Sequence, residues 1–262
     1  MSLRAATREL IKRVEDSSGR PVLVQTDPSL KVLATMRMAR GAAPAHLVAY
    51  NPSGGIAPDY LISFQCGFIL RLFANPPSER YDFAGSTTGR ARTLEAVSAQ
   101  PEIKKLSLPA SAVRAYADHI FDGLMTQLRS APIGLRVDSW LAADYPELRE
   151  LQQTFALRQL QDNQQILSPE VQRLAVSPTY EASAAMNAAF AGYWARVLDQ
   201  PSFVLPYKAT GVHLGQDLLA SWDAIDAHPL YDRGLIESWA HKLKLQGWYE
   251  WVPYSLDAGA ES

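Results

Sequence analysis

The stretch that decides the fold is residues 58–73, which read PDYLISFQCGFILRLF. Pro58 suits the first position of a helix, and the run Asn75-Pro76-Pro77 supplies a stop. Apolar side chains stand at positions 61, 62, 64, 68, 69, 70, 72 and 73, which wrap most of the helix circumference. The pattern predicts a helix that is buried on nearly every side. Phe64 and Phe68 lie one turn apart on the same face, so we expect their rings to be buried and in contact, with Gln65 beside them.

The chain before this helix predicts one helix and three strands. Residues 4–15 carry an apolar stripe with helical spacing and are followed by a stop at Gly19. Three runs rich in Val, Leu and Thr follow, at 21–25, 31–37 and 46–50, separated by turn residues. We expect a short opening helix and a small antiparallel sheet.

The chain after the helix is predicted to be mostly helical. Residues 78–105 are polar and indicate a loop with one helical turn at most. Helical periodicity then predicts six helices, at 109–129, 146–164, 168–175, 179–198, 214–225 and 231–246. The alanines of the fourth predict close packing against a neighbouring helix. We therefore expect two domains, residues 1–105 and residues 106–262.

Residues 45–73 resemble the ImmA/IrrE-type zinc metallopeptidase family, and residues 1–75 resemble it in layout. The resemblance rests on the strand 46–50, the Asn51-Pro52 turn, the helix start Pro58-Asp59-Tyr60, Gly67 and Arg71. Members of that family carry His-Glu-x-x-His on the buried helix, where the two histidines bind zinc and the glutamate activates water. In this chain the same slot reads Phe64-Gln65-Cys66-Gly67-Phe68. The resemblance implies an α+β fold with a zincin-like N-terminal part followed by an α-helical part.

The replacements remove the chemistry of the motif. Phenylalanine has no lone pair for zinc, so Phe64 and Phe68 stand where two of the usual three protein ligands would be. Gln65 keeps the length of glutamate but cannot accept a proton at neutral pH. We expect neither a metal nor another cofactor, and no catalytic residue at positions 64, 65 and 68.

The resemblance implies a catalytically inactive pseudo-metallopeptidase that binds another protein and has a regulatory role. Because catalytic relatives cut transcriptional repressors, the implied partner is a transcriptional regulator or a component of a bacterial stress-response or phage-defence system. Two surfaces are candidates for binding. The first is strand 46–50, with His46 and Tyr50, which we expect at the sheet edge where such peptidases add a substrate strand. The second is the C-terminal aromatic segment with Trp248 and Trp251, which would either anchor an interface or close the core, depending on its exposure.

The sequence leaves two alternatives to a pseudo-metallopeptidase. A hydrolase with a rebuilt metal site could draw on Asp118, His119 or Asp138, although Asp118, His119 and Asp122 equally suit a solvated helix face. A purely structural subunit is the second alternative. Cys66 is expected to be a small buried apolar residue, because no activating group accompanies it.

Composition excludes some partners. The chain has 25 basic and 27 acidic residues and a formal charge of −2, so nucleic acid is not favoured as the main partner. The single cysteine excludes an internal disulfide. We see no signal-peptide pattern and no apolar run of membrane-spanning length, and we expect a cytoplasmic protein without membrane contact.

Overall fold

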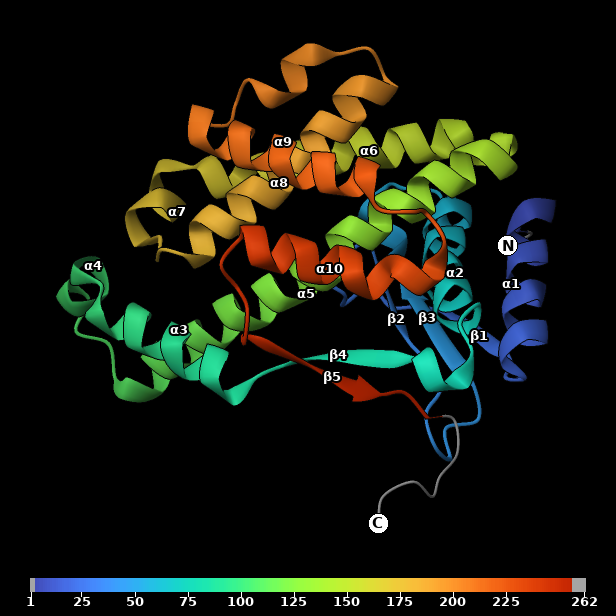
Figure 1. Ribbon diagram of the computed structural model, residues 1–262, viewed down its shortest axis with the longest axis horizontal. Helices are drawn as coiled ribbons and strands as arrows, with labels where there is room; N and C mark the ends of the chain where they lie inside the picture. The colour runs from blue at the N-terminus through green and yellow to red at the C-terminus, as the bar shows by residue number, and fades with distance from the viewer. Residues whose placement is uncertain (1–2, 256–262) are drawn as a thin grey trace. The chain divides into compact units, whose positions relative to one another are not determined.

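The computed structural model describes residues 3–255 and has an α+β fold (Figure 1). The chain forms two compact units. The first holds the residues up to Asp82, then Arg136–Leu157 and the chain from Val252; the second holds Phe83–Leu135 and Arg158–Trp251. These units are discontinuous, unlike the segments 1–105 and 106–262 expected from the sequence. The reason is that helices α5 (Ala110–Asp144) and α6 (Arg149–Asn163) each contribute residues to both.

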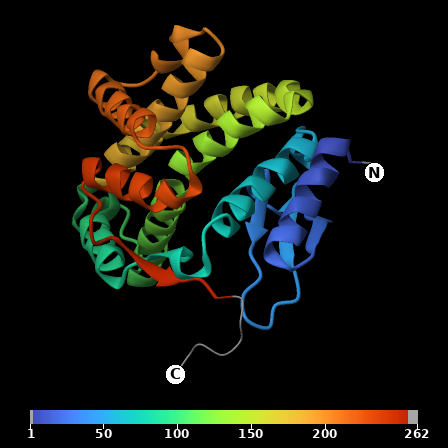
Figure 2. The same cartoon turned by 45° about the vertical axis from the view of Figure 1, so that its right-hand side comes forward.

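The first unit begins as predicted, with a helix, three strands and a second helix. Helix α1 spans Ala5–Ser18 and ends at Gly19, whose φ of 68° is the left-handed conformation that glycine adopts readily. The strands are β1 (Val22–Thr26), β2 (Ala34–Arg37) and β3 (His46–Tyr50), and helix α2 spans Pro58–Phe73. Helices α1 and α2 pack side by side over the sheet (Figure 2).

The sheet corrects two predictions. Its order is β1-β3-β2, so β3 is the central strand and the prediction that His46–Tyr50 forms an edge is wrong. The sheet is also mixed instead of antiparallel, because β1 runs parallel to β3 while β2 runs antiparallel to it. The physical reason lies in burial: four of the five residues of β3 are buried, whereas β1 and β2 are largely half-buried or exposed. A strand with so little exposed surface is most stable between two neighbours.

Helix α2 is held by contacts at its start and its middle. The Asp59 carboxylate accepts hydrogen bonds from the Arg4 backbone N–H at 2.6 Å and from the Thr7 hydroxyl at 3.0 Å, which ties α2 to the start of α1. At the middle, a Cβ on Gly67 would collide with the Val137 side chain of α5. The absence of a side chain at Gly67 therefore lets α2 and the end of α5 approach closely.

The second unit is helical and also holds most residues of a short two-stranded sheet. Residues 78–105, expected to be a loop, instead form β4 (Tyr81–Gly85), α3 (Thr87–Ala99) and α4 (Pro101–Lys105). Ser86 caps α3, since its hydroxyl accepts from the Gly89 backbone N–H at 3.0 Å. The remaining elements are α7 (Pro169–Leu174), α8 (Thr179–Val197), α9 (Ala209–Ala224), α10 (Asp232–Lys242) and β5 (Tyr249–Pro253), which pairs with β4.

The close packing expected of the alanine-rich helix is confirmed. Helices α8 and α9 lie against each other (Figure 1). A Cβ on Gly215 of α9 would lie 2.9 Å from the backbone nitrogen of Ala189. Small residues on both helices thus allow near-contact of their backbones. Within residues 3–255, no helix combines the length and the apolar character that crossing a membrane requires.

Candidate functional site

Helix α2 carries an aromatic cluster at Phe64 and Phe68. The rings of Phe64 and Phe68 meet edge to face with centroids 5.3 Å apart, which confirms the predicted contact. Phe64 also lies 5.8 Å from the ring of Tyr60 and 5.9 Å from that of Phe155 in α6. We call these four residues the aromatic slot. Phe64 and Phe68 are half-buried, which is less than the burial expected from the sequence.

The residues between the two phenylalanines supply no nucleophile. Gln65 is half-buried and neutral. The Cys66 side chain is fully buried, and burial raises the pKa of its thiol to about 12, with the charge of Glu15 adding to the effect. Since the thiolate is the reactive form, Cys66 is inert near neutral pH and packs as a small apolar side chain, as expected.

A buried carboxyl group lies against the aromatic slot. The Asp138 carboxyl oxygen Oδ1 accepts hydrogen bonds from the Tyr60 hydroxyl and, at 3.0 Å, from the Gln152 amide. The same amide donates to the Asp138 backbone oxygen at 2.8 Å. Burial raises the pKa of Asp138 to about 7, against the two hydrogen bonds that favour the charged form. Asp138 is therefore a buried polar group that hydrogen-bonds one residue of the aromatic slot, Tyr60.

The side chains of the slot do not fit a zinc ion. Phe64 and Phe68 have no lone pair for a metal and contact each other, and Gln65 between them carries a neutral amide. Of the proposed replacement ligands, Asp138 lies in the same unit as α2, and its carboxyl oxygen Oδ1 already accepts two hydrogen bonds. Across residues 3–255, no group of three or more His, Cys, Asp or Glu side chains is arranged to hold a metal.

The other proposed replacement ligands belong to an ion-pair cluster in the second unit. Arg90 binds the Asp118 carboxylate at 2.8 Å and the Asp122 carboxylate at 2.6 Å. Its guanidinium also lies 4.7 Å from the ring centroid of Phe121. The two carboxylates thus hold α3 against α5, and His119 is exposed beside them. This arrangement is that of a structural salt bridge on a helix surface.

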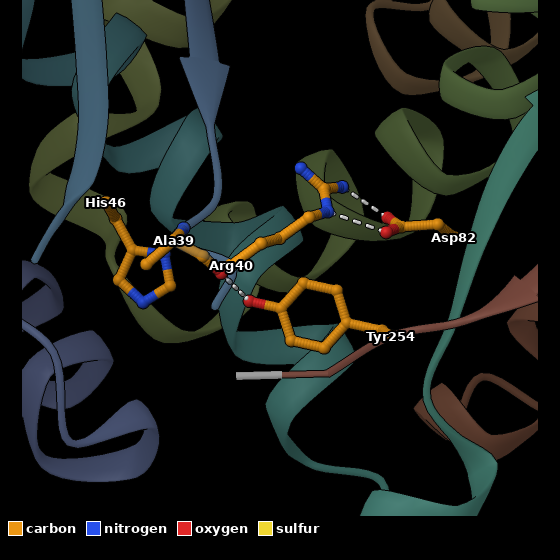
Figure 3. A network of polar contacts seen from close by, with 5 residues as sticks. All are labelled: Ala39, Arg40, His46, Asp82 and Tyr254. Atoms are coloured by element: carbon orange, nitrogen blue, oxygen red, sulfur yellow. Dashed lines mark hydrogen bonds and ion pairs between the residues drawn. The ribbon is translucent and has the colours of Figure 1, made fainter. Parts of the chain in front are cut away.

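His46 and Tyr50 lie in the core of the first unit. The His46 side chain is fully buried, and its Nδ1 accepts from the Ala39 backbone N–H at 3.1 Å (Figure 3). The neighbouring Ala39 carbonyl accepts from the Tyr254 hydroxyl, and Arg40 forms a forked ion pair with Asp82 (Figure 3). Burial, together with the charge of Arg20, lowers the pKa of His46. The network fixes the backbone after β2 and leaves His46 unable to contact a partner in this conformation.

The C-terminal aromatics close the core of the second unit. The side chain of Trp248 is buried and stacks over Phe121, with ring centroids 6.3 Å apart. Trp251 is half-buried, and its indole N–H donates to Glu237 at 2.9 Å. Of the two alternatives for this segment, exposure favours core closure over an interface. Neither Trp248 nor the strand with His46 and Tyr50 therefore offers a free binding surface.

Sequence reasoning missed two members of the slot. Tyr60 precedes Phe64 by one helical turn, so helical spacing could have identified it. Phe155 comes from a helix distant in sequence, and no local pattern indicates that contact. Comparison with protein-family models, curated proteins and solved structures found no match for this chain. Function is therefore inferred from the side chains themselves.

One prediction follows for the slot. We expect Phe64→Ala to lower the free energy of unfolding by about 2–3 kcal/mol, because it removes three ring contacts from a half-buried position. Urea denaturation of the two proteins measures the difference. Phe64→Leu, which keeps most of the apolar volume, should lose less than half as much. A loss below about 1 kcal/mol for Phe64→Ala would contradict a packed slot.

Proposed function

We propose that this chain is a catalytically inactive, metallopeptidase-like protein that acts by binding another protein. The observation that carries the proposal is the aromatic slot of α2. Where the resembled family has two zinc-binding histidines and a glutamate, this chain has two phenyl rings in contact and a glutamine. The order of opening helix, small sheet and buried helix supports a zincin-like N-terminal part.

The surroundings of the slot add support. Tyr60 and Phe155 pack against Phe64, so the space beside the helix is filled by aromatic side chains. Asp138 is hydrogen-bonded to Tyr60 and Gln152 instead of being free to act on water. A site that has been filled by packing contributes stability, and the protein then acts through its surface.

The mode of binding differs from that of a peptidase. A partner strand cannot pair with β3, because β3 already has a neighbouring strand on each side. The partner class proposed from the resemblance is a transcriptional regulator or a component of a bacterial stress-response or phage-defence system, in the cytoplasm. This part of the proposal is an analogy at the level of the fold.

Metal content and peptide hydrolysis test the inactive half of the proposal. We expect the purified chain, incubated with zinc and then dialysed, to retain far less than one zinc per molecule, since two ligand positions are phenyl rings. We also expect that the protein does not hydrolyse unfolded casein in a chelator-sensitive manner. Stoichiometric zinc by mass spectrometry, with chelator-sensitive cleavage, would instead establish the alternative of a hydrolase with a rebuilt site.

Co-purification from the native host tests the binding half. Cross-linking before lysis, followed by mass spectrometry, should recover a protein whose cross-links fall on this chain at defined positions. The same experiment with the Phe64→Ala variant controls for nonspecific capture by a destabilised protein. Cross-links spread evenly over the surface, with no enriched partner, would contradict a binding module.

A further inference from the structure

A groove in the second unit lies between α3, α4 and the start of α5, with a cavity volume of about 590 Å³. Its apolar lining comes from Leu94, Ile103, Leu108 and Val113, and its charged lining from Lys104 and Arg114. The rest is serine and alanine, and no acidic residue contributes. The groove therefore combines an apolar floor with positive charge.

The two cations are available to a ligand. Neither Lys104 nor Arg114 has a side-chain hydrogen bond or ion pair with any residue among 3–255. Neighbouring cations differ in this respect, since Lys105 pairs with Glu102 at 2.6 Å and Arg90 pairs with two carboxylates. Lys104 and Arg114 are both exposed at the groove.

The apolar side of the groove extends onto the surface. In the loop between α4 and α5, Leu106 is 51% exposed and Leu108 is 43% exposed. Between them, Ser107 has a φ of 48°, in the left-handed region that residues other than glycine seldom adopt. Leu106 and Leu108 thus add exposed apolar surface beside the groove, which a partner could bury.

We propose that this groove binds the partner protein through an amphipathic segment in which acidic side chains accompany leucine-sized apolar ones. The inference rests on the proposed binding function and names the chemistry of the partner. The acidic side chains would pair with Lys104 and Arg114, and the apolar ones would bury the exposed leucines. Nucleic acid is a poorer match, because the lining has no aromatic side chain for base stacking and half of it is apolar.

Fluorescence anisotropy tests the proposal on the full chain. The probe is a labelled synthetic helical peptide with leucines at i, i+3, i+4 and i+7 and glutamates at most other positions. Two matched peptides replace the glutamates by lysines or the leucines by alanines. We expect the first peptide to bind saturably. Each of the two replacement peptides should bind at least about tenfold more weakly, and added salt should weaken the binding of the first peptide.

Protein variants locate the binding. The double variant Lys104→Glu, Arg114→Glu should weaken binding at least about tenfold, and Leu108→Asn at least about threefold. The matched control Arg92→Glu, Lys208→Glu reverses two exposed charges of the same unit outside the groove and should stay within about twofold. Equal circular dichroism spectra exclude misfolding as the cause of a loss.

Several results would overturn the proposal. These are the absence of saturable binding, equal binding of the three peptides, and equal effects of the groove and control variants. Tighter binding of duplex DNA or of phosphatidylserine vesicles, lost in the groove variant, would assign the groove to phosphate instead. If the peptide does not bind, the results of the zinc and casein experiments are unaffected. If the protein proves to be a zinc-dependent hydrolase, the proposed function is refuted, but the result of the peptide titration does not change.

Discussion

Replacing Asp138 by asparagine should remove a pH dependence of up to about 4 kcal/mol from the stability of this protein. For the wild type, we expect the contribution of Asp138 to the free energy of unfolding to fall as the pH rises from about 4 to about 7. The Asp138→Asn variant should lack this fall. Urea denaturation of both proteins at a series of pH values gives the difference in the free energy of unfolding at each pH.

The direction of the effect follows from proton binding. Burial raises the pKa of Asp138 from 3.8 in the unfolded chain to about 7 in the folded protein. Between these values the folded state holds a proton that the unfolded state has released, so raising the pH favours unfolding. Below about pH 4 both states are protonated and above about pH 7 both are ionised, and the contribution is constant in each range.

Two further variants separate this carboxyl from others. Glu150 is an exposed carboxylate on α6, and Glu150→Gln should leave the pH profile unchanged. Tyr60→Phe removes a hydrogen bond that favours the ionised carboxylate, so the fall should extend to higher pH. A constant difference between wild type and Asp138→Asn across this range would show that Asp138 titrates normally.

Local patterns predicted some helices well and others poorly. The helix expected at 109–129 continues to Asp144 as α5, and α3 and α4 lie where a loop was expected. The bounds of α2 match the sequence expectation at both ends, because Pro58 favours the first turn and Asn75-Pro76-Pro77 excludes continuation. The predicted helix at 179–198 matches α8 for a similar reason, since its alanines favour helix and permit close packing. These signals act within a few residues of the boundary that they set.

Strand order could not be predicted in the same way, because pairing joins distant residues. A signal was nevertheless present. Leu47, Val48, Ala49 and Tyr50 form a continuous apolar run, which is typical of a strand covered on both faces and flanked on both sides. The edge position expected for this strand came from the resemblance, and it is wrong because β3 lies between β1 and β2.

The candidate site was predicted in part. Spacing placed Phe64 against Phe68, but the contact of Phe64 with Phe155 of α6 joins residues distant in sequence, and both rings are only half-buried. The raised pKa of Asp138 likewise depends on its burial, which the hydrogen bonds from Tyr60 and Gln152 oppose. Burial of a polar group is a property of tertiary packing, so single-sequence patterns give little information about it.

Introducing a His-Glu-x-x-His motif with Phe64→His, Gln65→Glu and Phe68→His should first destabilise the protein. We expect a loss of about 4 kcal/mol or more without metal, because two rings leave the aromatic slot and polar groups enter it. Two imidazoles at i and i+4 then offer part of a zinc site. Zinc should raise the melting temperature of this triple variant and leave the wild type unchanged.

The size of the zinc response reports whether a third ligand exists. A metal bound only by the folded state adds about 2.7 kcal/mol when its concentration is about 100 times the Kd. Asp138 is the candidate in the same unit as α2, so adding Asp138→Asn to the triple variant should abolish most of the response, whereas adding Asp118→Asn should not. Calorimetric titration of all four proteins with zinc provides the Kd values. A response in the wild type equal to that of the triple variant would show that zinc binds elsewhere, and that the phenylalanines of α2 did not replace its ligands.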